Sequence, residues 1–290
     1  MDKFRVGIFL GCLFFSAVTC SASTRVIYPA DEIETDSRHG DLIEILNTAL
    51  MKTVPEFGPY ELKPSHSRMN EARYMLDLQK GEEVNVAWSA TSVEKEQAYL
   101  PIRIPLRKGI LGYRILLIAK DAQKRIDQVH TVEDLKKIMV GQGIGWGDVD
   151  LYRSNGLTVT TANYDNLFRM VAANRIDIFP RGVNEVLPEY EHYVKENPNL
   201  AIEKNLLIYY PWPFYFFFNK ADVALHDRIE AGLGKMIKDG SFDAIFKKYN
   251  RRMIQQLDLK SRRIITLNNT LLPKETPLNI PEFWFDPRRN

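Results

Sequence analysis

Two arginines stand next to prolines at the ends of short apolar runs, and their chemistry suits them to hold an anion. Arg103 lies between two prolines in Pro101-Ile102-Arg103-Ile104-Pro105, and Arg181 follows Phe179-Pro180. A guanidinium donates charge-assisted hydrogen bonds, often two at once, to a carboxylate or a phosphate. The pair predicts contact with an anionic or strongly hydrogen-bond-accepting small molecule, and an ordinary surface cation is the alternative at each position.

Three aromatic side chains occupy comparable positions in the sequence. Tyr28, Trp88 and Trp146 each stand at the end of a predicted strand or in the turn after it. Ligands of open α/β sheets collect at such strand ends, so the three rings are candidate ligand contacts, with burial in the core as the alternative. The backbone N–H groups of 145–148 are placed to bind an anion if a helix begins near Gly147.

Catalytic and metal-binding patterns do not occur in the sequence. The five histidines are isolated, no Gly-x-Ser-x-Gly is present, and both cysteines, Cys12 and Cys20, fall within the first 22 residues. The glycine-rich run 141–147 has Trp146 where a dinucleotide-binding loop needs its third glycine. We therefore expect no catalytic residue, no metal site and no cofactor.

The first 22 residues have the order of a secretory signal, with a basic start, an apolar run over 6–15 and small residues up to Ser23. Cleavage after Ala22 would start the mature chain at Ser23 and place it in the periplasm. The alternatives are a lipidated Cys20, which would make a lipoprotein, and an uncleaved anchor. The apolar run is shorter than the ~20 residues of a spanning helix, and no later run of the sequence reaches that length.

The charge balance is close to neutral. Lys and Arg number 39 and Asp and Glu 37, so the formal net charge is +2. Loss of Asp2, Lys3 and Arg5 with the signal would leave 37 against 36, or +1. Such a chain gives no support to a nucleic-acid or anionic-membrane partner. Hydrophobic residues make up 45% of the sequence, which is enough apolar material for two lobes without disulfides.

Alternating apolar segments predict two successive α/β units with mostly parallel sheets. The first unit is predicted as strands and helices over 25–28, 41–51, 60–62, 70–79 and 84–88. The second unit is predicted over 113–119, 131–134, 137–140, 157–160, 164–173 and 176–179. Two further strands and two helices follow, over 206–210, 214–218, 224–238 and 241–249. Four prolines from Pro273 onward predict an extended tail.

Several stretches follow a known order along the chain. They are Ala87-Trp88-Ser89-Ala90-Thr91-Ser92-Val93-Glu94-Lys95, Tyr99-Leu100-Pro101-Ile102, Arg107-Lys108-Gly109, Asn174-Arg175-Ile176-Asp177 and Asp239-Gly240-Ser241-Phe242. By their order and spacing the chain resembles the extracellular solute-binding proteins of the polar amino-acid type, family 3. The resemblance implies a two-lobed, periplasmic-binding-protein-like α/β fold of type II, with two hinge strands and a ligand cleft between the lobes.

The resemblance also implies a division of the chain. After the signal at 1–22, the first lobe would comprise 23–113 and 217–250. The second lobe, 114–216, would be inserted between these two parts, and 251–290 would form the extended C-terminal tail. The two helices over 224–249 would then pack on the lobe that contains the helix at 41–51.

Two positions depart from the family pattern. The family holds the carboxylate of an amino acid with an arginine and its ammonium with an aspartate, and these positions carry Lys95 and Gly182 here. A lysine offers a point charge instead of a planar fork, and glycine offers no charge. An ordinary α-amino acid is therefore not the expected ligand. The candidate ligand contacts are Tyr28, Trp88, Thr91, Lys95, Arg103, Trp146 and Arg181.

The function that the resemblance implies is capture of a small polar solute. The two arginines predict that this solute is anionic. A monomer would bind this small-molecule ligand and deliver it to a membrane permease. A ligand-sensing protein read by a membrane receptor is the alternative, and a dehydratase-like enzyme on the same fold is a further one.

Overall fold

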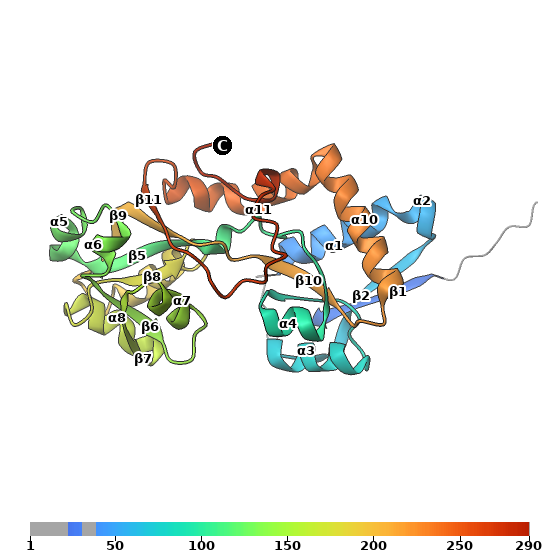
Figure 1. The fold of residues 1–290 in the computed structure, drawn as a ribbon, viewed down its shortest axis with the longest axis horizontal. Helices are drawn as coiled ribbons and strands as arrows, with labels where there is room; N and C mark the ends of the chain where they lie inside the picture. Colours follow the sequence, from blue (N-terminus) through green and yellow to red (C-terminus); the bar gives the residue numbers. More distant parts are fainter. Residues whose placement is uncertain (1–22, 31–38, 290) are drawn as a thin grey trace, which may run out of the picture.

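Two lobes lie along the longest axis of the computed structural model, which describes residues 23–30 and 39–289 (Figure 1). The predicted signal at 1–22 lies outside these described residues. Within the described ranges, no helix is both long enough and apolar enough to cross a membrane.

The first lobe contains two small sheets. β1 and β2 pair in parallel, and the other sheet has the order β3-β10-β4, with β10 antiparallel to both neighbours. The strands are β1 (Thr24–Ala30), β2 (Tyr60–Arg68), β3 (Ala87–Ala90), β4 (Leu100–Ile102) and β10 (Phe214–Phe218). The helices are α1 (Gly40–Lys52), α2 (Val54–Phe57), α3 (Glu71–Lys80) and α4 (Val93–Ala98). Asn70 caps the start of α3 by accepting a hydrogen bond from the Arg73 N–H at 3.0 Å.

The second lobe contains a four-stranded sheet of order β11-β9-β5-β8 and a parallel pair, β6 and β7. The strands are β5 (Tyr113–Ala119), β6 (Met139–Gly143), β7 (Thr158–Ala162), β8 (Phe179–Gly182), β9 (Leu200–Tyr209) and β11 (Arg263–Thr266). The helices are α5 (Gln123–Ile126), α6 (Val132–Leu135), α7 (Asp148–Ser154), α8 (Tyr164–Ala172) and α9 (Val186–Tyr193). The four-stranded sheet is mixed, whereas the sequence predicted mostly parallel sheets. β5 enters this lobe and β9 leaves it, so the two strands run in opposite directions.

Two long helices follow β10, namely α10 (Val223–Asp239) and α11 (Ser241–Gln256). Both contact α1, as the division of the chain predicted. Ile229 and Leu233 of α10 share one buried core with Leu42 and Leu46 of α1. The close approach depends on Gly232, because a Cβ there would lie 2.3 Å from the Ala49 carbonyl oxygen.

The chain passes between the lobes in two segments, 103–112 and 210–213, which we call the crossover segments. They touch at Gly112, where a Cβ would lie 1.9 Å from the Tyr210 carbonyl oxygen, so only glycine fits. The Tyr210 N–H in turn donates to the Gly112 carbonyl oxygen at 3.2 Å. β10 lies wholly in the first-lobe sheet, so the return crossing ends before Phe214, a little earlier than the expected boundary at 216.

The C-terminal part of the chain connects the two lobes again. Phe242 and Ile245 of α11 lie in the first-lobe core, whereas Phe246 lies in a second-lobe core together with Leu257. α11 continues beyond residue 251, where an extended tail was predicted. Part of that segment is then ordered as β11, which pairs in parallel with β9. The reason is that the helix-disfavouring prolines begin only at Pro273.

Candidate functional site

A cavity of about 840 Å³ lies between the lobes and takes its lining from both of them. The first lobe, with β10 and α11, contributes His39, Asp41, Glu71, Phe214, Tyr249 and Asn250. The second lobe contributes Arg114, Tyr164, Arg181, Asn184, Glu185, Pro188 and Glu189. The crossover segments add Arg107, Leu111 and Trp212. The volume lies within the range of known small-molecule sites.

Arg181 is buried in the second-lobe wall, with 6% of its surface exposed. Its guanidinium donates two hydrogen bonds to the Glu189 carboxylate, at 2.6 and 2.7 Å, and lies 2.9 Å from Glu185. The rings of Trp146 and Phe179 flank it, at 4.7 and 5.0 Å from their centroids. Burial alone would lower the pKa of Arg181, but the hydrogen bond to Glu189 and the charge of Glu185 raise it above its usual value. Arg181 therefore stays charged and is held by its own carboxylates.

Arg114 is a second buried arginine in this wall. It donates to the Tyr210 hydroxyl at 2.6 Å and pairs with Asp148 at 3.0 Å, while the Tyr210 hydroxyl donates to Asp148 at 2.7 Å. Burial raises the pKa of the Tyr210 hydroxyl well above its usual value. Arg114 is a member of β5, a strand whose other side chains are apolar or aromatic. A single arginine in an otherwise apolar run is the sequence signal for this network.

Arg107 and Asp41 form a third paired charge, in the first-lobe wall. The guanidinium donates to both carboxylate oxygens, at 2.6 and 2.7 Å. Asp41 lies in the first turn of α1, where the helix dipole favours a negative charge. Only 13% of the Arg107 side chain and 10% of the Asp41 side chain is exposed. The sequence showed Arg107 only as part of the family pattern, and its pairing with Asp41 could not be predicted because the two residues are far apart in the chain.

Glu185 occupies the space beside Gly182. The Gly182 N–H donates to its carboxylate at 3.0 Å, and a Cβ at position 182 would lie 3.0 Å from that same oxygen. The Glu185 carboxylate thus fills the place that a side chain at position 182 would take. It lines the cavity with 39% of its side chain exposed, whereas the Arg181 side chain is 8% exposed.

The chain is similar to solved structures of two-lobed binding proteins. No protein-family model matches the chain, and no curated protein matches it. Among solved structures, the probable amino-acid ABC transporter extracellular-binding protein ytmK from Bacillus subtilis matches with a TM-score of 0.53 and 16% identity, over 78% of this chain and 97% of that one. Bacillus subtilis YckB matches with a TM-score of 0.51 and 16% identity, over 85% and 96%. The chain has the binding-protein fold.

This result confirms the predicted fold class, the two-lobed binding-protein fold with mixed helices and sheets. An ancestral arginine-binding protein bound to arginine also matches, with a TM-score of 0.46 and 20% identity, over 78% of this chain and 97% of that one. At identities this low the likeness concerns the fold.

Of the seven residues predicted from the sequence as ligand contacts, only Arg181 lines the interlobe cavity of this binding-protein fold. Arg103 instead donates two hydrogen bonds to Glu96 of α4, at 2.9 and 2.6 Å. The Thr91 hydroxyl donates to the same Glu96 carboxylate at 2.7 Å. Lys95 bonds Glu71 at 2.8 Å, the Ala90 carbonyl oxygen at 3.1 Å, and Ser89. These side chains form a polar network beside the cavity. Glu71, which lines the cavity, connects the network to it.

The three predicted aromatic contacts have different environments. Trp88 is 1% exposed and packs in the first-lobe core against Tyr28 and Phe216, with centroids 6.0 and 6.5 Å away. Trp88 is therefore buried in the core, which was the alternative to ligand contact. His39, which lines the cavity, lies 5.3 Å from the Trp88 ring, so Trp88 supports the wall from behind. Trp146 stacks on Phe179 at 6.1 Å and covers Arg181.

The predicted anion cradle at 145–148 carries a carboxylate of its own. α7 begins at Asp148 with Gly147 as its N-terminal flanking residue, as expected. The Asp148 carboxylate lies in the first turn of the helix and pairs with Arg114. Because a negative side chain already lies near the helix start, this position is less favourable for an anionic ligand than the sequence suggested.

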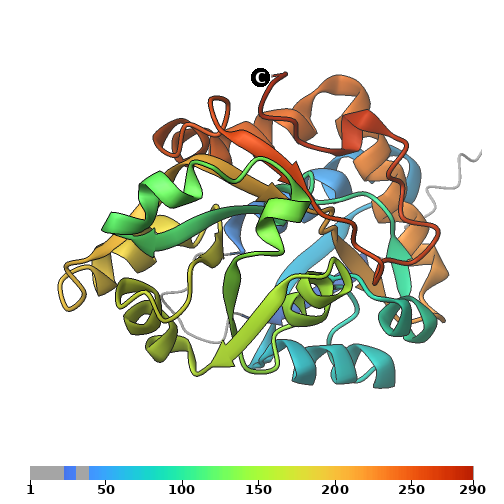
Figure 2. The ribbon, with the colours of Figure 1, turned by 60° about the vertical axis from the view of Figure 1, so that its left-hand side comes forward.

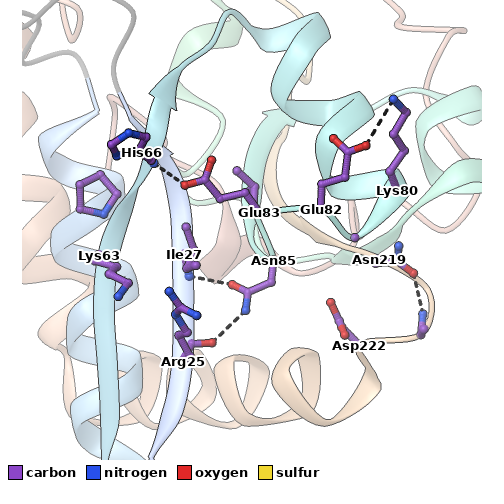
Figure 3. A pocket seen from close by; sticks show the side chains of 14 residues that line it. Arg25, Ile27, Lys63, His66, Lys80, Glu82, Glu83, Asn85, Asn219 and Asp222 are labelled. Carbon is purple, nitrogen blue, oxygen red and sulfur yellow. Dashed lines mark hydrogen bonds and ion pairs between the residues drawn. The ribbon is translucent and has the colours of Figure 1, made fainter.

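A second polar cavity, of about 870 Å³, lies on the first lobe and shares no lining residue with the interlobe cavity (Figure 3). Lys63 of β2 pairs with Glu61 at 3.1 Å, and Lys80 of α3 pairs with Glu82 at 3.5 Å. Glu83 accepts a hydrogen bond from the backbone of β2. One lobe provides all of the walls of this cavity, so closure of the two lobes would not bury a ligand in it. The interlobe cavity is therefore the candidate site.

Proposed function

We propose that the chain binds a small polar solute in the interlobe cavity and delivers it to a membrane transporter. The cavity supports this proposal, because charged side chains from both lobes line it and closure of the lobes would bury a ligand between them. The fold supports it as well, because a matching structure is a probable extracellular-binding protein of an amino-acid transporter. We propose export by the cleaved signal and a binding role without catalysis.

The charge of the solute follows from the pairing of the arginines. Each arginine in the cavity wall already has a carboxylate partner, namely Asp41 for Arg107, Asp148 for Arg114 and Glu189 for Arg181. An anion in the cavity would have to compete with these largely buried carboxylates for the guanidinium N–H groups. Removing one partner of a buried ion pair costs about 3–5 kcal/mol. The geometry therefore does not favour the anionic solute that Arg103 and Arg181 predicted from the sequence.

Glu185 supports a positive charge on the solute instead of a negative one. In the second-lobe wall, two arginines face three carboxylates, those of Asp148, Glu185 and Glu189. The wall therefore carries a formal net charge of −1, because +2 stands against −3, although each of its carboxylates has an arginine partner. Glu185 itself lies 2.9 Å from Arg181 and 4.0 Å from Arg114, and it is the most exposed of the three carboxylates. We therefore propose a solute that carries a protonated amine, which contacts the exposed part of the Glu185 carboxylate while the contacts to the arginines remain.

Calorimetric titration with three groups of compounds tests this proposal. The panel contains amines and zwitterionic amino acids, dicarboxylates, and inorganic phosphate. We expect binding in the first group only. A hydrogen bond between charged groups contributes about 1.5–3 kcal/mol, so Glu185→Gln should weaken binding by roughly ten- to a hundredfold.

Glu191→Gln is the matched control, because Glu191 lies on α9, the helix that begins directly after Glu185, is exposed and does not line the cavity. It should bind like the unchanged protein. Tight binding of a dicarboxylate or phosphate, unaffected by Glu185→Gln, would overturn the charge assignment. Uptake measured in cells with and without the gene then tests delivery to a transporter, and unchanged uptake of the bound solute would contradict that role.

A further inference from the structure

The chain crosses the boundary between the lobes once more after β11. Residues 267–289, which we call the C-terminal strap, leave the second-lobe sheet and reach the first lobe (Figures 1 and 2, red). The two crossover segments and α11 already connect the lobes. The strap is a further connection, and it contacts both crossover segments.

The start of the strap is fixed to the second lobe. It continues from β11, and the Leu267 N–H donates to the Tyr209 carbonyl oxygen at 2.7 Å. Asn155 and Asn268 then exchange two hydrogen bonds, at 2.7 and 2.9 Å. Next, the Asn269 side-chain amide donates to the Pro211 carbonyl oxygen at 2.9 Å. This last contact is made to the crossover segment 210–213.

The end of the strap is fixed to the other crossover segment and to both lobes. Phe283 packs against the first-lobe core. The Trp284 ring lies on Gly109, where a Cβ would come within 2.4 Å of it. The Phe285 N–H donates to the Lys108 carbonyl oxygen at 2.7 Å. Phe285 is 3% exposed and lies in a second-lobe core, where its carbonyl oxygen accepts from the Tyr113 hydroxyl of β5 at 2.8 Å.

Closure of a two-lobed protein is concentrated in a few backbone torsions of the connecting segments. In this chain both connecting segments are held by the strap, at Pro211 and at Lys108–Gly109. The strap thus joins the first-lobe core, through Phe283, to the second-lobe core, through Phe285. A large rotation of the lobes would have to break one of these contacts, move Trp284 from Gly109 or pull Asn269 from Pro211. We infer that the C-terminal strap limits how far the lobes open and keeps the cavity near its binding geometry.

Distance measurements between the lobes test this inference without any ligand. A chain that begins at Ser23 has no cysteine, so Gln79→Cys on α3 and Thr161→Cys on β7 allow two spin labels at exposed positions. The intact chain should give a narrow distance distribution. Trp284→Ala, and separately a chain ending at Asn269, should give a broader distribution that extends to longer distances. Leu278→Ala is the control, because Leu278 belongs to the strap but is 53% exposed, and it should leave the distribution unchanged.

The result that overturns the inference is an unchanged distribution in Trp284→Ala and in the shortened chain, both folded by circular dichroism. If the shortened chain does not fold, Trp284→Ala and Asn269→Ala decide. Affinity for a solute gives a second measurement. A binding-competent fraction that falls to about a third or a tenth weakens the apparent affinity three- to tenfold. Failure to find a solute would count against the proposed function and leave the distance result intact.

Discussion

Gly232 and Gly234 lie two residues apart in α10 and should respond in opposite ways to the same change. A Cβ at Gly232 would lie 2.3 Å from the Ala49 carbonyl oxygen and 2.7 Å from its carbon, both backbone atoms of α1. A Cβ at Gly234 meets no atom within 4 Å. Alanine is favoured over glycine in a helix interior by about 0.8–1.0 kcal/mol. Gly234→Ala therefore gains this propensity without a clash.

At Gly232 the same propensity gain is opposed by overpacking. A carbon and a carbonyl oxygen in contact normally lie about 3.3–3.6 Å apart, so α1 and α10 would have to separate by about 1 Å. Forcing extra atoms into a well-packed core costs typically 1–3 kcal/mol, and a required shift of backbone places Gly232→Ala toward the upper end. The net expectation is a loss of about 1–2 kcal/mol for Gly232→Ala and a gain of up to about 1 kcal/mol for Gly234→Ala.

Thermal unfolding followed by circular dichroism measures the difference. For a chain of this size, 1 kcal/mol corresponds to about 2–4 °C in Tm. Gly232→Ala should lower Tm by roughly 2–8 °C, and Gly234→Ala should raise it by up to about 4 °C. An increase of similar size in both variants would refute the close packing of α1 on α10, and with it the placement of α10 in the first-lobe core.

Three further predictions concern other parts of the molecule. Glu203→Ala should destabilise the fold by about 3–5 kcal/mol. The reason is that the Glu203 carboxylate is fully buried, accepts hydrogen bonds from backbone N–H groups at 2.5–2.9 Å and lies 3.5 Å from buried Arg262. Chemical denaturation measures the free energy of unfolding, and a loss below about 1 kcal/mol would contradict the prediction. Burial, and then the hydrogen bond to Glu44, raise the pKa of Tyr249 to about 12, so this tyrosine should lower stability as pH rises from 10 through 12. Ring NMR signals of Tyr249 should titrate near pH 12 and shift toward 10 in Glu44→Gln; titration at 10 in both would count against it. N-terminal sequencing of the exported protein should begin at Ser23, and a modified Cys20 would show a lipoprotein instead.

The elements of the fold could be predicted because local patterns determine them. The apolar spacing of the first helix predicted 41–51, and the observed helix α1 spans Gly40–Lys52. The segment predicted over 131–134 contains the start of α6, which Thr131 caps as part of a capping box. The sheet directions could not be predicted in this way. β5 and β9 are antiparallel because one strand enters the lobe and the other leaves it, which is a property of the whole chain path.

The candidate site was harder to predict, because charge pairing joins residues that are distant in sequence. Arg103 has the right type for ligand binding, but Glu96 lies one helix earlier and takes both of its hydrogen bonds. Trp88 stands at a strand end, but its ring is buried in the first-lobe core. Glu185 was missed because it follows Gly182 by three residues, and only the turn between them brings its carboxylate back over the glycine. Residue type at one motif position therefore did not reveal the chemistry present there.

The strand order has a consequence for how the protein is made. The central strand of the first-lobe sheet, β10, comes from 214–218, and the edge strand of the second-lobe sheet, β11, comes from 263–266. Neither of these two sheets is complete until most of the polypeptide has been synthesised. After β10 has been made, synthesis of the 48 residues from there to Thr266, the end of β11, takes roughly 2–10 s at ~5–20 residues/s. Pairings between distant segments also form slowly. The nascent chain thus remains without its final sheets while its N-terminus is already far from the ribosome, which is the state that threading through a membrane channel requires.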